Sequence, residues 1–249
     1  RVYEIYVAEY PLPMDIAMET RSRLAEIFKL RLDYNRYYEE LGEIVAADRE
    51  AGIERTDRSR YLASKAALVL AERTYERFAD LQLTQPFEES LNEKQNRMDV
   101  ATSAFEELVS YEVADVTSAA TYYIAQIYMD FSVALLESER PAGLSEAEKV
   151  DYEMVLEEEA FPFEERAIEI HEENFELLAA GIYNEWVRQS LDELATLMPG
   201  RYAKNETSEG YLGSIDSYAY RMPIVPEVTT LPDAATESPD GFVTSQEPE

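Results

Sequence analysis

Cysteine is absent from the 249 residues, and histidine occurs once, at His171. The lack of cysteine excludes disulfides, thiolate metal sites and cysteine catalysis, although it does not identify a compartment. A di-iron helical bundle needs Glu-x-x-His motifs on two of its helices. The single histidine is preceded three positions earlier by Ile168, so the chain contains no such motif.

Other catalytic and ligand-binding motifs are missing as well. The sequence has no glycine-rich phosphate loop, no G-x-S-x-G turn and no H-E-x-x-H motif. It also lacks the EF-hand loop, in which Asp and Asn alternate around a central Gly. We therefore expect a protein that is not an enzyme and that uses no cofactor or metal.

Basic residues are scarce. The chain holds 22 Lys and Arg against 52 Asp and Glu, which gives a formal net charge of -30. Such a charge repels nucleic acid and anionic lipid surfaces unless a local basic patch overrides it, and the sequence shows no such patch. The hydrophobic fraction of 46% is too high for a wholly disordered acidic chain. We expect a folded acidic protein that does not bind nucleic acid.

No hydrophobic run is long enough to cross a membrane. The most apolar stretch, residues 121–136 (TYYIAQIYMDFSVALL), is interrupted by Gln126, Asp130 and Ser132. It is shorter than the roughly 20 apolar residues that a membrane span needs. A helix that is apolar nearly all round must be covered on several sides. We predict a helix buried among other helices, and no direct membrane insertion.

Apolar residues recur at helical spacing as far as Tyr202, and no segment in that range has the pattern of a strand. The pattern predicts helices over residues 2–11, 14–32, 34–48, 57–83, 87–111, 121–136, 163–180 and 182–198. A further helix starts at 145 and is predicted to be broken or kinked at Pro162. The first helix has no start signal, and the sequence begins at Arg1. We therefore expect a piece of a longer protein that opens inside a helix pair.

Several helix ends carry their own signals. Asp33 is a predicted N-cap, either Thr56 or Asp57 is another, and Ser145 with Glu148 forms a predicted capping box. Gly181 is expected directly after a helix end, because glycine adopts the left-handed conformation that often closes a helix.

The composition changes after about residue 204. Residues 205–249 are rich in Ser, Tyr, Pro and acidic residues and cannot assemble a core of their own. Residues 211–228 are nevertheless too apolar for a simple tether. We expect a helical domain over residues 1–204 and an irregular tail over 205–249, of which 211–228 lies extended on the helices and the rest is flexible.

The helices share a recurring arrangement of small and aromatic residues. First helices carry Leu24, Ala25 and Phe28 or the matching Ile124, Ala125 and Tyr128, and second helices carry Ala101, Phe105 and Leu108 or Val187, Leu191 and Leu194, with Pro199 following. Together with Tyr3, Tyr6, Tyr10 and Pro11, these residues resemble the tetratricopeptide repeat (TPR) family over about residues 2–202. The resemblance implies an all-α solenoid of antiparallel helix pairs. The structural repeat positions that it implies are Ala25, Phe28, Ala101, Phe105, Ala125, Tyr128, Leu191 and Pro199.

Residues 44–72 and 183–202 are also similar to large bacterial TPR proteins of the cell envelope. That similarity implies a periplasmic or envelope location and the C-terminal part of a longer solenoid. A cytoplasmic location is the alternative.

Carboxylates crowd residues 146–185, where Lys149 and Arg166 are the nearest opposing charges. Three interpretations stay open: a solvated acidic face, a surface for a basic partner, and a weak Ca²⁺ site. His171 is expected to lie at an interface or to be partly buried, and Trp186 is expected to take part in packing. Tyrosines of a solenoid can also line a peptide groove. The candidate partner-binding residues are Tyr37, Tyr61, Tyr122, Glu157, Glu158, Glu165, Glu169 and Glu172.

Solenoids present broad surfaces that commonly bind peptides or other proteins. We therefore predict a non-enzymatic scaffold that binds a protein or peptide partner, basic in character, along an acidic, Tyr-containing surface. The alternative is a structural building block that self-associates or stacks on the rest of a longer solenoid.

Overall fold

The computed structural model describes residues 2–203, and every regular element in that part of the chain is a helix. The α-helices are α1 (Val2–Glu9), α2 (Met14–Leu30), α3 (Tyr34–Glu50), α4 (Asp57–Ala79), α5 (Phe87–Val109), α6 (Ala114–Leu136), α7 (Glu146–Glu176), α8 (Glu185–Leu197) and α9 (Pro199–Tyr202). Two short 3₁₀ helices, η1 (Gly52–Glu54) and η2 (Leu177–Ala180), follow α3 and α7. The predicted all-α class is confirmed for these residues.

The chain divides into two units, residues 1–204 and residues 205–249. The second unit includes residues 211–228, so the extended path predicted for them lies outside the described residues. Within residues 2–203, no helix combines the length and the apolar character that crossing a membrane requires.

The predicted N-caps are present at three helix starts. Asp33 accepts a hydrogen bond from the backbone N–H three residues further on. Thr56 and Ser59 bond to each other's backbone N–H groups at the start of α4, and Ser145 and Glu148 do the same at the start of α7. The first turn of a helix leaves these N–H groups without an intrahelical partner. Because the caps are local, they mark the helix starts in the sequence itself.

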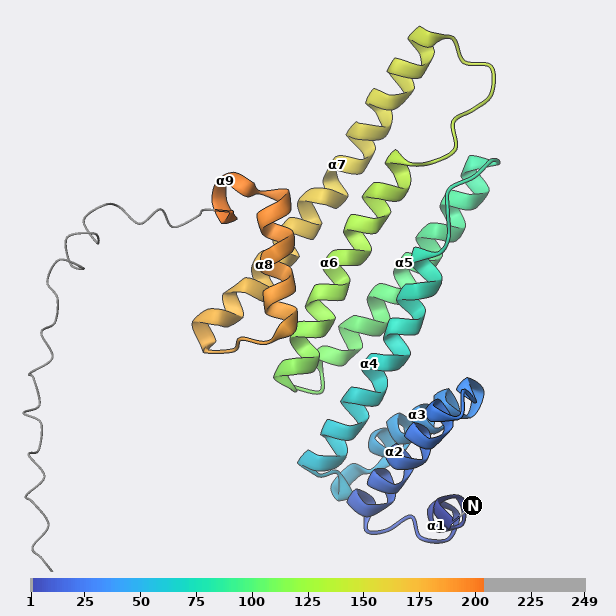
Figure 1. Cartoon of the computed structure of the whole chain (residues 1–249), viewed down its shortest axis with the longest axis vertical. Helices are drawn as coiled ribbons and strands as arrows, with labels where there is room; N and C mark the ends of the chain where they lie inside the picture. The colour runs from blue at the N-terminus through green and yellow to red at the C-terminus, as the bar shows by residue number, and fades with distance from the viewer. Residues whose placement is uncertain (1, 204–249) are drawn as a thin grey trace, which may run out of the picture. The chain divides into compact units, whose positions relative to one another are not determined.

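Consecutive helices pack against each other along the chain, and from α2 to α7 they run antiparallel (Figure 1). Further contacts join α2 to α4, α4 to α6 and α6 to α8. Helix α8 thus contacts the alternate helix α6, as α4 contacts α2 and α6, and its predicted equivalence with α5 stays a prediction. The residue spacing that the two helices share, four and then three, occurs in any helix that buries one face, so it does not distinguish first from second helices.

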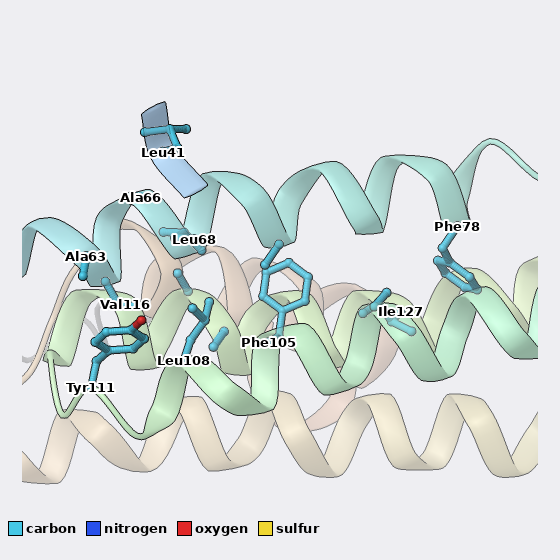
Figure 2. Close-up of a cluster of buried hydrophobic side chains, with 14 of the residues drawn as sticks. Leu41, Ala63, Ala66, Leu68, Phe78, Phe105, Leu108, Tyr111, Val116 and Ile127 are labelled. Atoms are coloured by element: carbon cyan, nitrogen blue, oxygen red, sulfur yellow. The ribbon is translucent and has the colours of Figure 1, made fainter. Parts of the chain in front are cut away.

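The core is continuous through α4, α5 and α6. Figure 2 shows Phe105 and Leu108 of α5 and Val116 of α6 close to α4, which contributes Ala63 and Phe78. Each of these side chains is at most 2% exposed. Burying one large apolar side chain contributes about 1.5–3 kcal/mol relative to leaving it in water. These side chains tie three successive helices into one body.

The predicted repeat positions lie mostly inside this body. Five of them are buried: Ala25, Phe28, Ala101, Phe105 and Ala125. Two are half-buried, Tyr128 and Leu191, and Pro199 is exposed as the first residue of α9.

Helix α6 is covered by α4, α5, α7 and α8. Its Ala125, Ile127 and Phe131 are at most 1% exposed. The prediction of a buried helix over residues 121–136 is confirmed, although the helix begins earlier, at Ala114. The added turns contain further fully buried small residues, so the enclosed part extends toward the start of the helix.

Helix α7 continues through Pro162, where the sequence predicted a break or a kink. Proline removes one backbone hydrogen bond and costs about 3 kcal/mol inside a helix. Here Pro162 and Glu158, whose carbonyl loses its partner, are both exposed, so water can satisfy that carbonyl. Ala160 and Ala167 are buried on either side of the proline, and the Phe163 ring lies 4.5 Å from that of Phe131. Packing on both sides of the proline holds the helix together.

Candidate functional site

Helix α7 has two faces of opposite character. Its inner face carries Leu156, Ala160, Ala167 and Ile170, each at most 5% exposed. An α-helix has 3.6 residues per turn, so residues two positions from an inner residue point away from the core. The acidic residues of α7 follow that rule and lie mainly on its outer side.

Three of the predicted carboxylates are fully available to a partner. Glu157, Glu158 and Glu165 are exposed, and none has an ion pair or hydrogen bond from its side chain within residues 2–203. Two turns of helix separate Glu158 from Glu165, so these two share a face. The structure places an unpaired group of negative charges at the middle of α7.

The other two predicted carboxylates are engaged. Arg166 Nη1 lies 2.8 Å from Glu169 Oε2. Glu172 is half-buried and accepts hydrogen bonds from Arg201 Nη1 at 2.6 Å and from the Tyr202 hydroxyl at 2.7 Å. Glu172 therefore connects α7 to α9 rather than facing a partner with free oxygens.

The three predicted tyrosines do not join this surface. Tyr37, on α3, is only 6% exposed, so its place among the partner-binding residues is corrected: its ring packs in the core. Tyr61, on α4, is 38% exposed and lies beneath two cationic side chains. Tyr122, on α6, is half-buried, with ring centroids 5.7 Å from His171 and 5.5 Å from Trp186. The predicted packing role of Trp186 agrees with that contact.

Sequence reasoning missed a row of apolar side chains on the outer face of α7. Val150, Met154 and Phe161 are 58%, 62% and 55% exposed. Their spacing of four and seven residues puts them on one side of the helix, between the exposed carboxylates. The sequence contains these residues as a second set of apolar positions at helical spacing. They were missed because the apolar positions of the buried face already accounted for the helix.

A cleft of about 520 Å³ lies between the end of α4 and the C-terminal part of α6, with Lys94 and Asp130 in its wall. Asp130 Oδ2 accepts a hydrogen bond from the Tyr75 hydroxyl at 2.7 Å. Burial raises the pKa of Asp130 and of Tyr75 above their ordinary values. Two features of the sequence could have indicated this cleft. Asp130 interrupts an apolar stretch, and Lys94 has the same helical spacing as the buried Met98 and Ala101.

The contacts of Lys94 give it a structural role. Its side chain is 1% exposed, and its Nζ donates to the carbonyls of Phe78 at 2.7 Å and Leu81 at 2.8 Å. A third carbonyl, that of Ala79, lies 3.5 Å away. Burial lowers the Lys94 pKa, yet the three carbonyls at the end of α4 occupy its donors and favour the charged form. No donor is left for a substrate.

His171 is fully buried between α7 and α8, whereas the sequence predicted an interface or a partly buried position. Its Nδ1 lies 3.2 Å from Ser190 Oγ, and Ser190 Oγ accepts a hydrogen bond from Asn174 Nδ2 at 2.8 Å. Asn174 donates in addition to the carbonyl of Ser118, 3.0 Å away. This polar cluster connects α7 to α6 and α8. Burial lowers the pKa of His171 to about 4, so the ring is neutral near pH 7.

Within the described part of the chain, no group of three or more His, Cys, Asp or Glu side chains is arranged to hold a metal ion. Comparisons with protein-family models, with curated proteins and with solved structures gave no match.

Proposed function

We propose that the chain is a non-enzymatic interaction scaffold that binds a basic protein or peptide on the outer face of α7. The observation that carries this proposal is the set of exposed carboxylates Glu157, Glu158 and Glu165, which have no side-chain partner among residues 2–203. The rest of α7 strengthens their field, because Lys149 and Arg166 are the cations of a helix that is otherwise rich in Glu. A surface of one sign attracts and orients a partner of the opposite sign.

We further propose that the helices stack as a TPR-like α-solenoid. The contacts of α2 with α4, α4 with α6 and α6 with α8 support this arrangement, since stacked helix pairs must touch through alternate helices. A stack of this kind would present α7 at a fixed orientation. The resemblance to bacterial envelope TPR proteins favours a periplasmic or envelope setting for the scaffold, with the cytoplasm as the alternative.

The test is binding of a fluorescent peptide of alternating Lys and Gly, measured by anisotropy at about 50 mM and about 500 mM salt. We expect the affinity to fall about tenfold or more at the higher salt, because salt screens exposed charges. The variant Glu157→Gln/Glu158→Gln/Glu165→Gln should weaken binding at low salt by a similar factor. Equal affinity at both salt concentrations would contradict the proposal.

A matched control removes three charges elsewhere. Glu88, Glu89 and Glu106 of α5 are exposed and likewise unpaired within residues 2–203. Their triple Gln variant has the same net charge as the α7 variant. If both variants lose the same affinity, the peptide responds to overall charge and α7 is not the binding surface.

Self-association is the second candidate, and α1 favours it. Helix α1 has no buried residue, and its Val2 and Ile5 are 78% and 49% exposed. Exposed apolar helices of this kind tend to find a partner surface. Light scattering distinguishes the two functions: a building block should form dimers or larger species that Ile5→Glu dissociates, whereas a scaffold should remain monomeric in both forms.

A further inference from the structure

The outer face of α7 carries apolar side chains where a solvent-facing helix surface is expected to be polar. Val150, Met154 and Phe161 form a row whose members are all more than half exposed. At 1.5 Å per residue, the row extends over about 16 Å of the helix. Figure 1 shows α7 at the margin of the helical unit, with its N-terminal turns extending past the end of α6. Exposed apolar side chains that gather on one side of a helix are characteristic of a surface that another molecule covers.

Carboxylates flank this row on both sides. Glu153 and Glu157 lie along one edge, and Glu158 and Glu165 lie along the other, as the 3.6-residue turn of the helix requires. All four are exposed. The face therefore combines an apolar centre with two negative rims. An occupant must carry apolar residues in the middle and positive charges on either side.

Charge complementarity selects among the possible occupants. A second copy of the chain would bring another strongly acidic surface, since the formal net charge is -30. Residues 205–249 are no better suited, because Arg221 is the one basic residue among many carboxylates in that part of the sequence. Like charges brought together in an interface cost binding energy. The occupant is therefore a basic partner.

The geometry of the row also indicates the partner's conformation. An α-helix makes its backbone hydrogen bonds internally, so the one carbonyl that Pro162 leaves without a partner on α7, that of Glu158, gives no row of unpaired groups to which an extended peptide could add as a strand. Spacings of four and seven residues match the apolar positions of a second helix laid alongside. A helix with one apolar stripe and Lys or Arg beside it fits both the centre and the rims.

We propose that the outer face of α7 docks a basic amphipathic helix, with its apolar stripe on Val150, Met154 and Phe161 and its cations against the flanking glutamates. This rests on the proposed function and specifies its partner. Binding then has two separable components, an electrostatic one from the rims and an apolar one from the centre, and they are lost through different substitutions.

The experiment compares two synthetic 18-residue probes of identical Leu and Lys composition. One has the order of an amphipathic helix, and the other is scrambled so that no apolar face forms. Anisotropy gives the affinity of each for the full chain, and circular dichroism follows the helicity of the probe on binding. We expect the amphipathic probe to bind at least about tenfold more tightly than the scrambled one and to gain helicity.

The variant Met154→Gln/Phe161→Gln removes the apolar centre without changing the charge. Both residues are exposed, so folding should be unaffected. It should weaken binding of the amphipathic probe about tenfold and leave the scrambled probe unchanged. The matched control is Leu30→Gln/Ile53→Gln, at positions that are 84% and 99% exposed on other parts of the helical unit, and it should change neither affinity.

The outcomes separate the two proposals. Equal binding of both probes, or no effect of Met154→Gln/Phe161→Gln, overturns the amphipathic-helix proposal while a salt-dependent affinity still supports the acidic scaffold. Absence of binding by either probe at low salt overturns both. A dimer that sediments as such and that Met154→Gln/Phe161→Gln dissociates would replace the basic helix with a second copy.

Discussion

Helices α6 and α7 pack against each other, but the fold covers them very differently. Helix α6 contacts α4, α5, α7 and α8, and its apolar residues point in every direction. Helix α7 has its main contacts with α6, α8 and the adjoining η2 in the described part of the chain, and its outer side is acidic around an exposed apolar row. The comparison shows that neighbouring helices cover α6 on every apolar side. On α7 they cover the inner apolar face and leave the outer apolar row exposed.

The largest expected effect is the difference in the free energy of unfolding between alanine variants of two phenylalanines, Phe131 of α6 and Phe161 of α7. They are 1% and 55% exposed. Phe131→Ala should lower the free energy of unfolding by about 3–5 kcal/mol, because it removes a buried ring and leaves a cavity. Phe161→Ala should change it by less than about 0.5 kcal/mol. Urea unfolding followed by circular dichroism measures both. Similar losses in the two variants would mean that Phe161 is covered and that the contrast between the helices is wrong.

Close packing around α6 can be tested by adding volume. Ala125 is fully buried, so Ala125→Leu should overpack its surroundings and lower the free energy of unfolding by about 1–3 kcal/mol. Ala147→Leu on α7 is the matched control, since Ala147 is exposed and the same four-carbon side chain enters water there. A neutral result at Ala125 would show that the neighbours of α6 leave space beside it.

Much of the fold follows from local features of the sequence. Caps such as Thr56 and Ser145 are decided by residues three apart, so their helix starts were predicted correctly. At Pro162 the sequence predicted a break or a kink, and the break does not occur, because whether a helix survives a proline depends on packing contributed by a distant part of the chain. The start of α6 was placed too late for a related reason: short Ala and Ser side chains have little apolar signal, although close helix contacts bury them fully.

The candidate site was predicted in part. The exposure of Glu157 and Glu158 follows from their charge, since unpaired charged side chains avoid the interior. The burial of Tyr37 could not be predicted, because a tyrosine ring can pack in a core or line a groove. The sequence also could not predict that the charged residues Lys94 and Asp130 lie inside the fold. Their burial depends on backbone carbonyls and a hydroxyl that only the folded chain brings to them.

The inner face of α7 should make stability depend on pH through His171. Burial lowers its pKa to about 4, whereas an unfolded histidine has a pKa of about 6.5. Between these values the unfolded chain binds the extra proton, so stability falls as the pH is lowered through this window. The loss should reach about 2 kcal/mol by pH 5. In His171→Gln that loss should disappear, which urea unfolding at pH 7 and pH 5 can measure.

Because His171 is the single histidine of the chain, its imidazole Hε1 gives one resonance that NMR can follow during an acid titration. A midpoint well below 6 is expected while the protein stays folded. A midpoint at or above 6.5 would show that the inner face of α7 is open to water, and the contrast with its outer face would be lost.

The smallest expected effect concerns how the two helices end. Helix α6 closes at Glu137 with a φ of -92°, whereas η2 at the end of α7 closes at Gly181 with a φ of 77°, which is left-handed. No atom lies within 4 Å of a Cβ added at Gly181, so Gly181→Ala tests the backbone alone. It should destabilise by about 1 kcal/mol. Gly42→Ala, inside α3 and equally free of contacts, should instead stabilise by about 0.5–1 kcal/mol, because alanine favours a helix interior. Opposite signs in thermal unfolding would show that the path from α7 into α8 depends on a left-handed residue, whereas the interior of α3 does not.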